Sequence, residues 1–176
     1  MIKQKTVLMA EISDIYHDAG VQKEADSFID AGYNVMVFGF RDVINCSDEK
    51  YNFRLITKPV LARKFRSFRK LDIMFLIFYY NLLIVFTKAD YYHSHNTLFL
   101  SGMWIASRLF KSKLIYDSHE VQWELNKIAK KLEEYFIHEV DRIINVSEGR
   151  AKVQAERFSL DINRIAVISN YPRIIS

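Results

Sequence analysis

Residues Lys113–Glu120 read KLIYDSHE, and this stretch decides the fold that we expect. The apolar run Leu114–Tyr116 includes strand-favouring residues, and the polar group Asp117–Glu120 follows it at once. This pattern predicts a buried strand with polar side chains at its carboxyl end. Because open parallel sheets bind ligands at that end of their strands, other polar loops that reach the same edge are candidate site residues.

The composition is that of one globular domain. Of the 176 residues, 50% are hydrophobic and 14% aromatic, which gives enough apolar surface to offset the entropy lost on folding. Cys46 is the single cysteine, so no internal disulfide can form, and we expect a reducing, cytoplasmic location. The N-terminal apolar run is too short for a signal peptide and lacks a small-residue cleavage site, so we expect no export.

Alternating strand and helix patterns predict an α/β domain of three layers with a mostly parallel sheet of about seven strands. The opening βαβ unit combines strands at Thr6–Ile12 and Tyr33–Phe40 with a helix at Val21–Ala31, which Gly32 ends. Further strands are expected at Tyr51–Thr57, Ala89–His93, Leu114–Asp117, Arg142–Val146 and Arg164–Ile168. Further helices are expected at Leu71–Phe86, Thr97–Phe110, Val121–Val140 and Glu148–Phe158, the last with Ser147 as its N-cap.

A basic segment precedes the most apolar of these helices. Its charged residues fall within eight positions, and they are Arg63, Lys64, Arg66, Arg69 and Lys70. The run Leu71–Phe86 is shorter than the roughly 20 apolar residues that span a membrane. We therefore expect a helix that is buried against the sheet. The alternative is that the basic segment and its aromatic side chains contact an anionic membrane surface.

Four polar loops are expected to share the carboxyl edge of the sheet, after the first, fourth, fifth and sixth strands. They carry Gly20, His95, Asn96, His119, Glu120, Ser147 and Glu148. Their convergence predicts one ligand-binding cleft. His119 is the strongest candidate, because a loop histidine can donate a hydrogen bond to a sugar or phosphate oxygen, or accept one.

The other histidines carry weaker signals. We expect His93 and His95 to point to opposite faces, with His95 toward the cleft and His93 in a structural role. His17 and His138 are expected on the surface of a loop and of a helix. The histidines and acidic residues of this edge lack the HExxH spacing, so we expect no metal. The chain has neither GxGxxG after its first strand nor a P-loop, which argues against a dinucleotide-binding domain.

Five segments carry a resemblance to a known family. They are HDAGVQKEADSFIDAGYNVMVFG, ADYYHSHN, KLIYDSHE, VDRIINVSE and AVISNYP, in this order. With their spacing, they resemble the N-terminal domain of family 4 glycosyltransferases, which are retaining enzymes of the GT-B fold. The likeness covers Val7–Pro172. It implies two Rossmann-like domains that face each other across a cleft, the N-terminal one for the acceptor and the C-terminal one for the nucleotide-sugar donor.

The resemblance implies that this chain is the first half alone. Residues 1–172 correspond to the acceptor-binding domain and 173–176 to the start of a linker, whereas the C-terminal donor-binding domain and its Glu-rich motif have no counterpart. The enzyme would need no metal or other cofactor, since the nucleotide sugar is a co-substrate. We therefore expect this chain to be inactive without a donor-binding domain as its partner.

The resemblance also implies roles for individual residues. His119 matches a histidine near the donor sugar, and it would position and polarise the reacting groups without covalent attack. His95 and Asn96 match the loop that faces the cleft. Gly20 stands where family members often have the arginine of an Asp-x-Arg-Val motif. This loop either approaches its ligand through backbone amides or lacks that contact.

The function that we expect is acceptor binding in a retaining glycosyltransferase. The enzyme would transfer sugar to a glycan or lipid-linked acceptor in cell-surface polysaccharide synthesis, on the cytoplasmic face of the membrane. One alternative is a non-catalytic α/β module that binds a small molecule or a protein at the same edge. A nucleic-acid binder would suit the pI of about 9.1, but the basic residues adjoin an apolar run and lack spread-out stacking aromatics.

Overall fold

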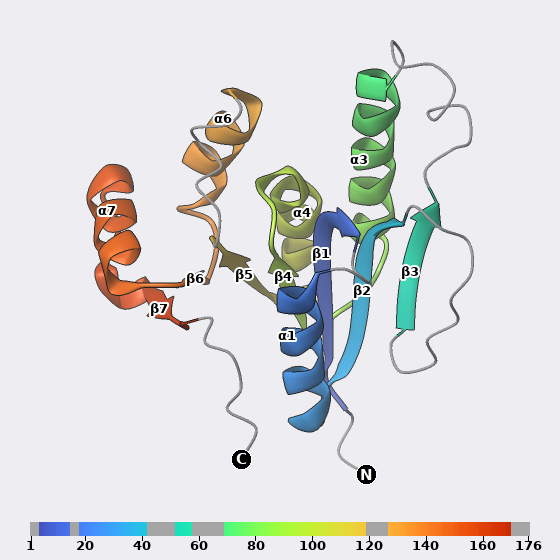
Figure 1. The fold of residues 1–176 in the computed structure, drawn as a ribbon, viewed down its shortest axis with the longest axis horizontal. Coiled ribbons are helices and arrows are strands. Elements are labelled where there is room, and N and C mark those ends of the chain that lie inside the picture. Colours follow the sequence, from blue (N-terminus) through green and yellow to red (C-terminus); the bar gives the residue numbers. More distant parts are fainter. Residues whose placement is uncertain (1–3, 15–17, 42–51, 58–68, 119–126, 170–176) are drawn as a thin grey trace.

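A seven-stranded sheet runs through the part of the chain that the computed structural model describes, namely residues 4–14, 18–41, 52–57, 69–118 and 127–169 (Figure 1). Its order is β3-β2-β1-β4-β5-β6-β7, and every neighbouring pair is parallel. The strands are β1 (Thr6–Asp14), β2 (Asn34–Arg41), β3 (Asn52–Thr57), β4 (Tyr91–Ser94), β5 (Lys113–Asp117), β6 (Arg142–Asn145) and β7 (Ile165–Val167). The prediction of a parallel sheet of about seven strands is therefore confirmed.

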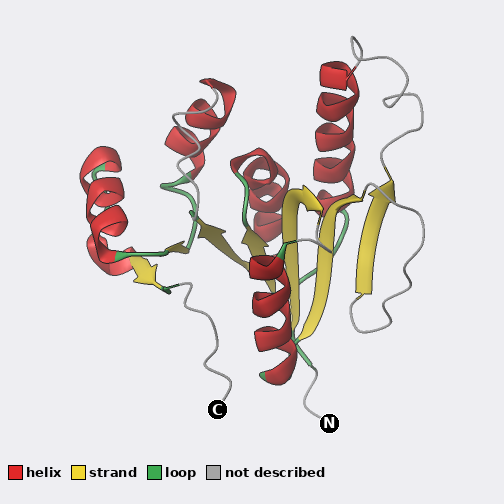
Figure 2. Cartoon of the chain, viewed as in Figure 1, coloured by secondary structure: helices red, strands yellow, loops and turns green. Residues whose placement is uncertain are grey.

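Helices cover both faces of this sheet (Figure 2). They are α1 (Ala19–Asp30), α3 (Arg69–Val85), α4 (Leu100–Phe110), α6 (Lys127–Phe136) and α7 (Glu148–Phe158), with the short 3-10 helices η1 (Thr97–Phe99) and η2 (Ile162–Arg164). Helix α1 packs on one face, and α3, α4, α6 and α7 pack on the other, which gives three layers. Among the helices that the structure describes, none is both long and apolar enough to cross a lipid bilayer.

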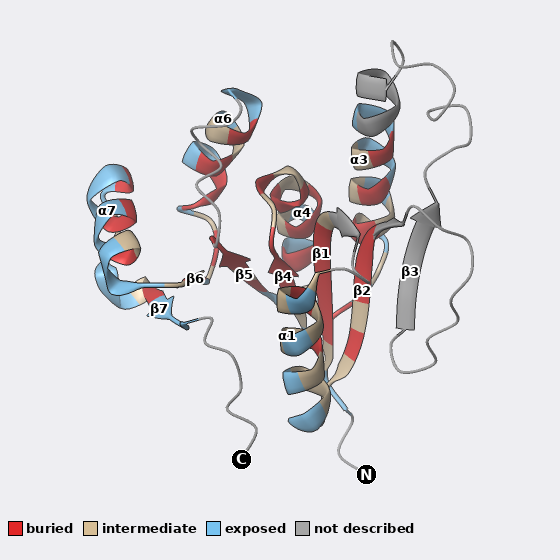
Figure 3. Ribbon diagram, viewed as in Figure 1, coloured by how far each residue is buried: buried red, intermediate tan, exposed pale blue. Residues whose placement is uncertain are grey.

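Strand β1 shows how the sequence builds this core. Val7 and Met9 pack with α1, whereas Leu8 and Ala10 pack with the helices of the opposite face. All four are at most 1% exposed, because side chains alternate along a strand and both faces of a parallel sheet are covered. Figure 3 shows the buried residues along β1 and β2. The central strands therefore form a rigid base for the residues at their carboxyl ends.

The expected helices are present with shifted ends. Gly32, with a φ of 85°, follows α1 as predicted. The helix predicted at Val121–Val140 is described only as α6, because residues 119–126 lie outside the described part, and α6 ends before Val140. The helix predicted at Thr97–Phe110 begins as a 3-10 turn, η1, before α4.

Helix α3 is buried on one side only. Leu76, Tyr80 and Ile84 are at most 5% exposed and face the sheet, as predicted for a helix packed against it. On the other side, Phe75 and Phe78 are more than 60% exposed. The helix is thus more apolar than its contacts within this domain require.

Candidate functional site

The carboxyl ends of β1, β4, β5 and β6 lie along one edge of the sheet, because all four strands are parallel and adjacent. Helix α1 begins at this edge, with Asp18 as its N-cap. The carboxylate of Asp18 accepts hydrogen bonds from the backbone N–H groups of Gly20 at 3.1 Å and Val21 at 3.2 Å. The amide of Gly20 is therefore engaged within the helix start, and Asp18, not the glycine, opens the helix.

His93 and His95 lie side by side beneath this edge. Their rings stack with centroids 4.5 Å apart at an angle of 25°, and the residues are 1% and 2% exposed. The prediction that they point to opposite faces was wrong, because side chains two positions apart on a strand lie on the same face. Both belong to the face that α1 covers, where the ring of Phe28 meets His93 edge-on.

Two carboxylates meet these imidazoles. The Nε2 atoms of His93 and His95 lie 3.7 Å and 3.5 Å from Oε2 of Glu24 on α1. The Nδ1 atom of His95 lies 3.4 Å from Oδ2 of Asp117, the last residue of β5. Burial alone would lower the pKa of His95, but the hydrogen bond to Asp117 and the charges of Glu24 and Asp117 raise it above its ordinary value.

Glu24 was not among the predicted site residues, although the sequence carries a signal for it. Val21, Ala25 and Phe28 form the apolar stripe of α1 at helical spacing, and Glu24 falls within this stripe. A carboxylate on the core-facing side of a helix requires a polar partner. The two histidines of β4 supply it, which only the three-dimensional arrangement shows.

A second polar cluster is buried under the end of β5. Glu133 of α6 accepts hydrogen bonds from the Tyr116 hydroxyl at 3.1 Å and from Gln154 Nε2 at 3.3 Å. The same Gln154 nitrogen donates to Ser118 Oγ at 2.9 Å, and the Gln154 oxygen accepts from Asn145 at 2.5 Å. These bonds join α6 and α7 to the ends of β5 and β6. They fix Ser118, the residue directly before His119.

Burial dominates the electrostatics of this second cluster. It raises the pKa of Glu133 to about 7, although the hydrogen bonds from Tyr116 and Gln154 act in the opposite direction. Burial, with the charge of Glu133 nearby, also raises the pKa of Tyr116 well above its ordinary value. Glu133 therefore changes its protonation near neutral pH, whereas Tyr116 stays protonated.

Of the remaining predicted residues, Asn96, Ser147 and Glu148 lie along the edge, whereas His138 precedes β6 at the opposite edge of the sheet. The Oδ1 atom of Asn96 accepts from Leu98 N at 3.1 Å and so caps η1. Ser147 caps α7 as predicted by accepting from Arg150 N, and both it and Glu148 are exposed at the start of that helix. His138 is exposed after α6. The structure thus brings His95 into direct contact with Asp117, while Ser147 and Glu148 lie at the neighbouring strand end.

Several predicted residues lie outside the described part of the chain. They are His17, Arg63, Lys64, Arg66, His119 and Glu120. Arg69 and Lys70 form the start of α3, but their side chains are not described. The predicted basic contact surface and the predicted catalytic histidine therefore stay predictions.

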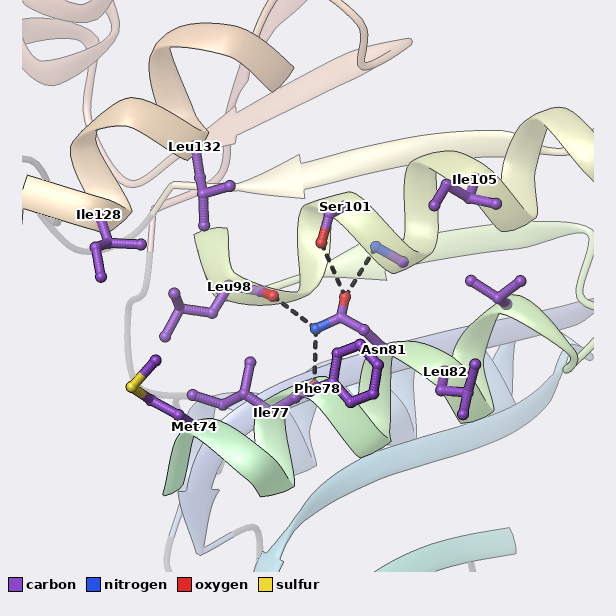
Figure 4. Close-up of a pocket in the computed structure, with 12 residues that line it drawn as sticks. Met74, Ile77, Phe78, Asn81, Leu82, Leu98, Ser101, Ile105, Ile128 and Leu132 are labelled. Carbon is purple, nitrogen blue, oxygen red and sulfur yellow. Dashed lines mark hydrogen bonds between the residues drawn. The ribbon is translucent and has the colours of Figure 1, made fainter. Parts of the chain in front are cut away.

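An apolar groove of about 740 Å³ lies between α3, α4 and α6 (Figure 4). Its lining residues are Met74, Ile77, Phe78, Asn81, Leu82, Val85, Leu98, Ser101, Gly102, Ile105, Ile128 and Leu132. No local sequence pattern predicts this groove, because its walls come from three separate helices. The available signal was α3 itself, a helix with apolar residues on nearly all sides.

Asn81, the polar residue at the base of the groove, forms its hydrogen bonds with other residues of the domain. Asn81 Nδ2 donates to the carbonyl oxygens of Ile77 and Leu98, both at 2.9 Å. Its Oδ1 accepts from Gly102 N at 2.8 Å and from Ser101 Oγ at 3.2 Å. Asn81 therefore joins α3 to α4, and the groove presents mainly aliphatic and aromatic walls to an occupant.

A comparison with protein families finds one match. The family model described as Glycosyltransferase Family 4 matches residues 21–171. A comparison with curated proteins finds no match. The matched range contains β4, β5, β6 and both polar clusters described above, whereas β1 and the start of α1 precede it.

Solved structures share the fold at low sequence identity. UGT89C1 of Arabidopsis thaliana, complexed with UDP-L-rhamnose, superposes with a TM-score of 0.64 and 14% identity over 98% of this chain and 50% of its own. The lipopolysaccharide outer core galactosyltransferase WaaB, in its apo form, superposes with a TM-score of 0.61 and 12% identity, over 97% of this chain and 47% of WaaB. Anabaena HepE, in complex with UDP and glucose, superposes with a TM-score of 0.56 and 14% identity, over 97% of this chain and 46% of HepE.

The chain thus spans about half the length of these three proteins. At identities of 12% to 14% the likeness shows the fold alone. It confirms the predicted Rossmann-like α/β domain of the GT-B glycosyltransferases.

Proposed function

The chain belongs to glycosyltransferase family 4, and from this premise we propose that it forms the acceptor-binding part of a retaining glycosyltransferase. The enzyme transfers a sugar from a nucleotide-sugar donor to a glycan or lipid-linked acceptor in cell-surface polysaccharide synthesis. The observation that carries the proposal is the polar edge at the carboxyl ends of β1, β4, β5 and β6, of which β4, β5 and β6 lie within the family match. Open α/β sheets bind ligands at this edge.

The donor is bound mainly by a second, C-terminal domain that faces this edge. Two observations support such a partner: the chain spans about half of the similar structures, and two of those are complexes with UDP-L-rhamnose or with UDP and glucose. The second domain lies beyond Ser176 or belongs to a separate subunit.

The reaction proceeds on one face of the donor sugar. The acceptor oxygen forms a bond to the anomeric carbon while the bond from that carbon to the nucleotide phosphate breaks, and the departing phosphate takes the acceptor proton. No side chain attacks the sugar, so the protein contributes by orientation and by hydrogen bonds to developing charge. No metal or other cofactor is required for this step.

His119 is the positioning group in this mechanism. It follows Ser118, which the cluster around Gln154 holds in place at the end of β5. Asn96, Glu120, Ser147 and Glu148 bind substrate with it, and the start of α1 approaches the substrate at Gly20, whose N–H already donates to Asp18. His95, at 2% exposure, forms the floor of this edge.

The apolar groove favours a lipid-linked acceptor over a free glycan. Leu98 and Ser101 line the groove from η1 and the first turn of α4, the elements that come after β4, so the groove begins next to the polar edge. An acceptor with its sugar at the edge and its apolar chain in the groove would bury hydrocarbon at about 0.8 kcal/mol per CH₂ group. The saturated hydrogen bonds of Asn81 leave walls suited to such a chain.

A binding experiment tests the groove. We expect dansyl-labelled farnesyl phosphate to bind saturably, and Ile105→Asn to weaken binding at least 10-fold because it places an amide in the groove wall. Leu109→Asn, at an exposed position of the same helix outside the groove lining, is the matched control and should have no effect. Equal affinities for the two variants would contradict the lipid-linked assignment.

We further propose a peripheral location at the cytoplasmic face of the membrane. The basic residues Arg63, Lys64 and Arg66 precede α3 in the sequence, and Arg69 and Lys70 begin this helix, whose Phe75 and Phe78 are exposed. Basic charge beside exposed apolar side chains suits an anionic lipid surface. Reversing these charges should abolish binding to anionic vesicles but not alter the weak binding to neutral ones. Unchanged binding to anionic vesicles would exclude this contact.

A transfer assay on the two-domain enzyme tests the proposed chemistry. His119→Ala should lower kcat by about 10²–10³-fold, the usual loss of one oriented hydrogen-bond donor. His138→Ala removes an exposed histidine and should leave kcat unchanged. The anomeric configuration of the product, read by NMR, should equal that of the donor. An inverted product, or a fully active His119→Ala enzyme, would refute the mechanism.

A further inference from the structure

Two imidazoles and two carboxylates converge beneath the polar edge. Glu24, His93, His95 and Asp117 each offer one ligand atom, and these four atoms lie within 4.8 Å of one another. They come from α1, from the end of β4 and from the end of β5. All except Glu24 are buried. Because three separate segments supply them, the absence of HExxH spacing in the sequence says nothing about this cluster.

We propose that this cluster binds one divalent transition-metal ion, for which Zn²⁺ is the probe, through Glu24 Oε2 and the Nε2 atoms of His93 and His95. The oxygen lies 3.7 Å from one nitrogen and 3.5 Å from the other. A tetrahedral zinc ion with bonds of about 2.0–2.1 Å holds its ligand atoms about 3.3 Å apart. Shifts of a few tenths of an ångström bring these two distances to the zinc geometry, and the two rings must in addition turn out of their stacked arrangement.

Asp117 orients one of the ligands. Its Oδ2 lies 3.4 Å from His95 Nδ1, and a hydrogen bond from Nδ1–H to this carboxylate leaves the Nε2 lone pair directed toward Glu24. A carboxylate behind a metal-binding histidine fixes its tautomer and increases its basicity. The arrangement of three ligands and one orienting carboxylate leaves a fourth coordination position for water.

The chemistry of the donors selects the class of metal. Imidazole nitrogens suit zinc and cobalt, whereas magnesium and calcium take oxygen ligands. The Glu24 side chain is 37% exposed but its Oε2 atom is buried, so an ion enters from the α1 side only when this side chain moves. An ion bound by both Nε2 atoms lies in the plane of each ring, so binding must open the present angle of 25° between the stacked imidazoles. The ion would tie α1 to β4 below the substrate edge.

Metal titration of the chelator-treated chain tests this proposal. We expect one equivalent of Zn²⁺ per chain against a chromogenic competitor, and visible absorption bands of four-coordinate cobalt when Co²⁺ replaces it. Glu24→Gln and His93→Asn should each weaken Zn²⁺ binding at least 10-fold. Asp117→Asn should weaken it 10- to 100-fold, as loss of an orienting carboxylate does.

His138→Asn is the matched control, because it removes an exposed histidine outside the cluster. It should bind Zn²⁺ like the unsubstituted chain. Circular dichroism identifies any variant that does not fold, and Glu24→Gln is the mildest of the three substitutions because Glu24 is the least buried of the three residues. Less than one equivalent of Zn²⁺ in the unsubstituted chain, or equal affinity in His138→Asn and folded Glu24→Gln, would overturn the proposal.

Discussion

Replacing Glu133 by glutamine should stabilise the fold at pH 8 and leave its stability nearly unchanged at pH 5. Glu133 is 0% exposed, and burial raises its pKa from 4.5 to about 7. At pH values between these two pKa values, the folded chain keeps the Glu133 proton that the unfolded chain releases. The free energy of unfolding of the unsubstituted chain therefore falls as the pH rises from about 4.5 to 7.

The size of this effect follows from the two pKa values. They differ by about 2.5, and a difference of 1 corresponds to 1.36 kcal/mol, so the ionised carboxylate costs up to about 3 kcal/mol at pH 8. Glutamine keeps an oxygen that can accept the hydrogen bonds of Tyr116 and Gln154 at Oε1. It removes the charge without removing the volume.

Urea denaturation at pH 5 and pH 8 measures this effect. The unsubstituted chain should lose stability between the two pH values, whereas Glu133→Gln should lose about 2.5 kcal/mol less, because part of the full effect is already present at pH 5. Glu148→Gln, which removes a charge from an exposed position, is the matched control and should follow the unsubstituted chain. If Glu133→Gln and the unsubstituted chain show the same pH dependence, the carboxylate is not buried as described.

Two further predictions concern helix packing and a surface ion pair. A Cβ at Gly102 would lie 2.5 Å from the Asn81 side chain and 2.9 Å from its backbone, so Gly102→Ala should lower the free energy of unfolding by about 1–3 kcal/mol. Gly149 has open space around it, so Gly149→Ala should raise the free energy of unfolding by about 0.5–1 kcal/mol. Equal unfolding midpoints for the two would contradict the close contact of α3 and α4. Burial would raise the pKa of Asp141, but its hydrogen bond from Lys113 and other contacts lower it overall. The stability that Asp141 contributes is therefore present above the unfolded pKa and lost as the pH falls below it. Asp141→Asn should cost about 0.5–1 kcal/mol at pH 7 and little at pH 2.5, and a cost that persists in acid would refute the charge contribution.

The fold could be predicted because its signals are local. The apolar run of β5 and the strand–helix alternation around it are properties of short segments, and parallel strands force the same polar loops onto one edge. Ser147 as the cap of α7 and Gly32 after α1 are equally local, since each depends on a few neighbouring residues.

The contents of the site could be predicted only in part. His95 and Asp117 follow adjacent strands, so their contact is a consequence of topology. Glu24 reaches them from the sheet-facing side of α1, and its distance from them depends on how that helix packs. The groove likewise depends on the close approach of α3 and α4 at Gly102, which no local pattern reveals.

The most direct test of the central claim is a calorimetric titration with a panel of nucleotide sugars. It compares this chain alone with the same chain joined to its donor-binding domain, encoded beyond Ser176 or supplied as a separate subunit. If the chain is the acceptor-binding part of a glycosyltransferase, only the joined form binds a nucleotide sugar, and the sugar that binds identifies the donor. Binding of equal affinity to the chain alone would contradict the account, because the polar edge would then be a complete donor site.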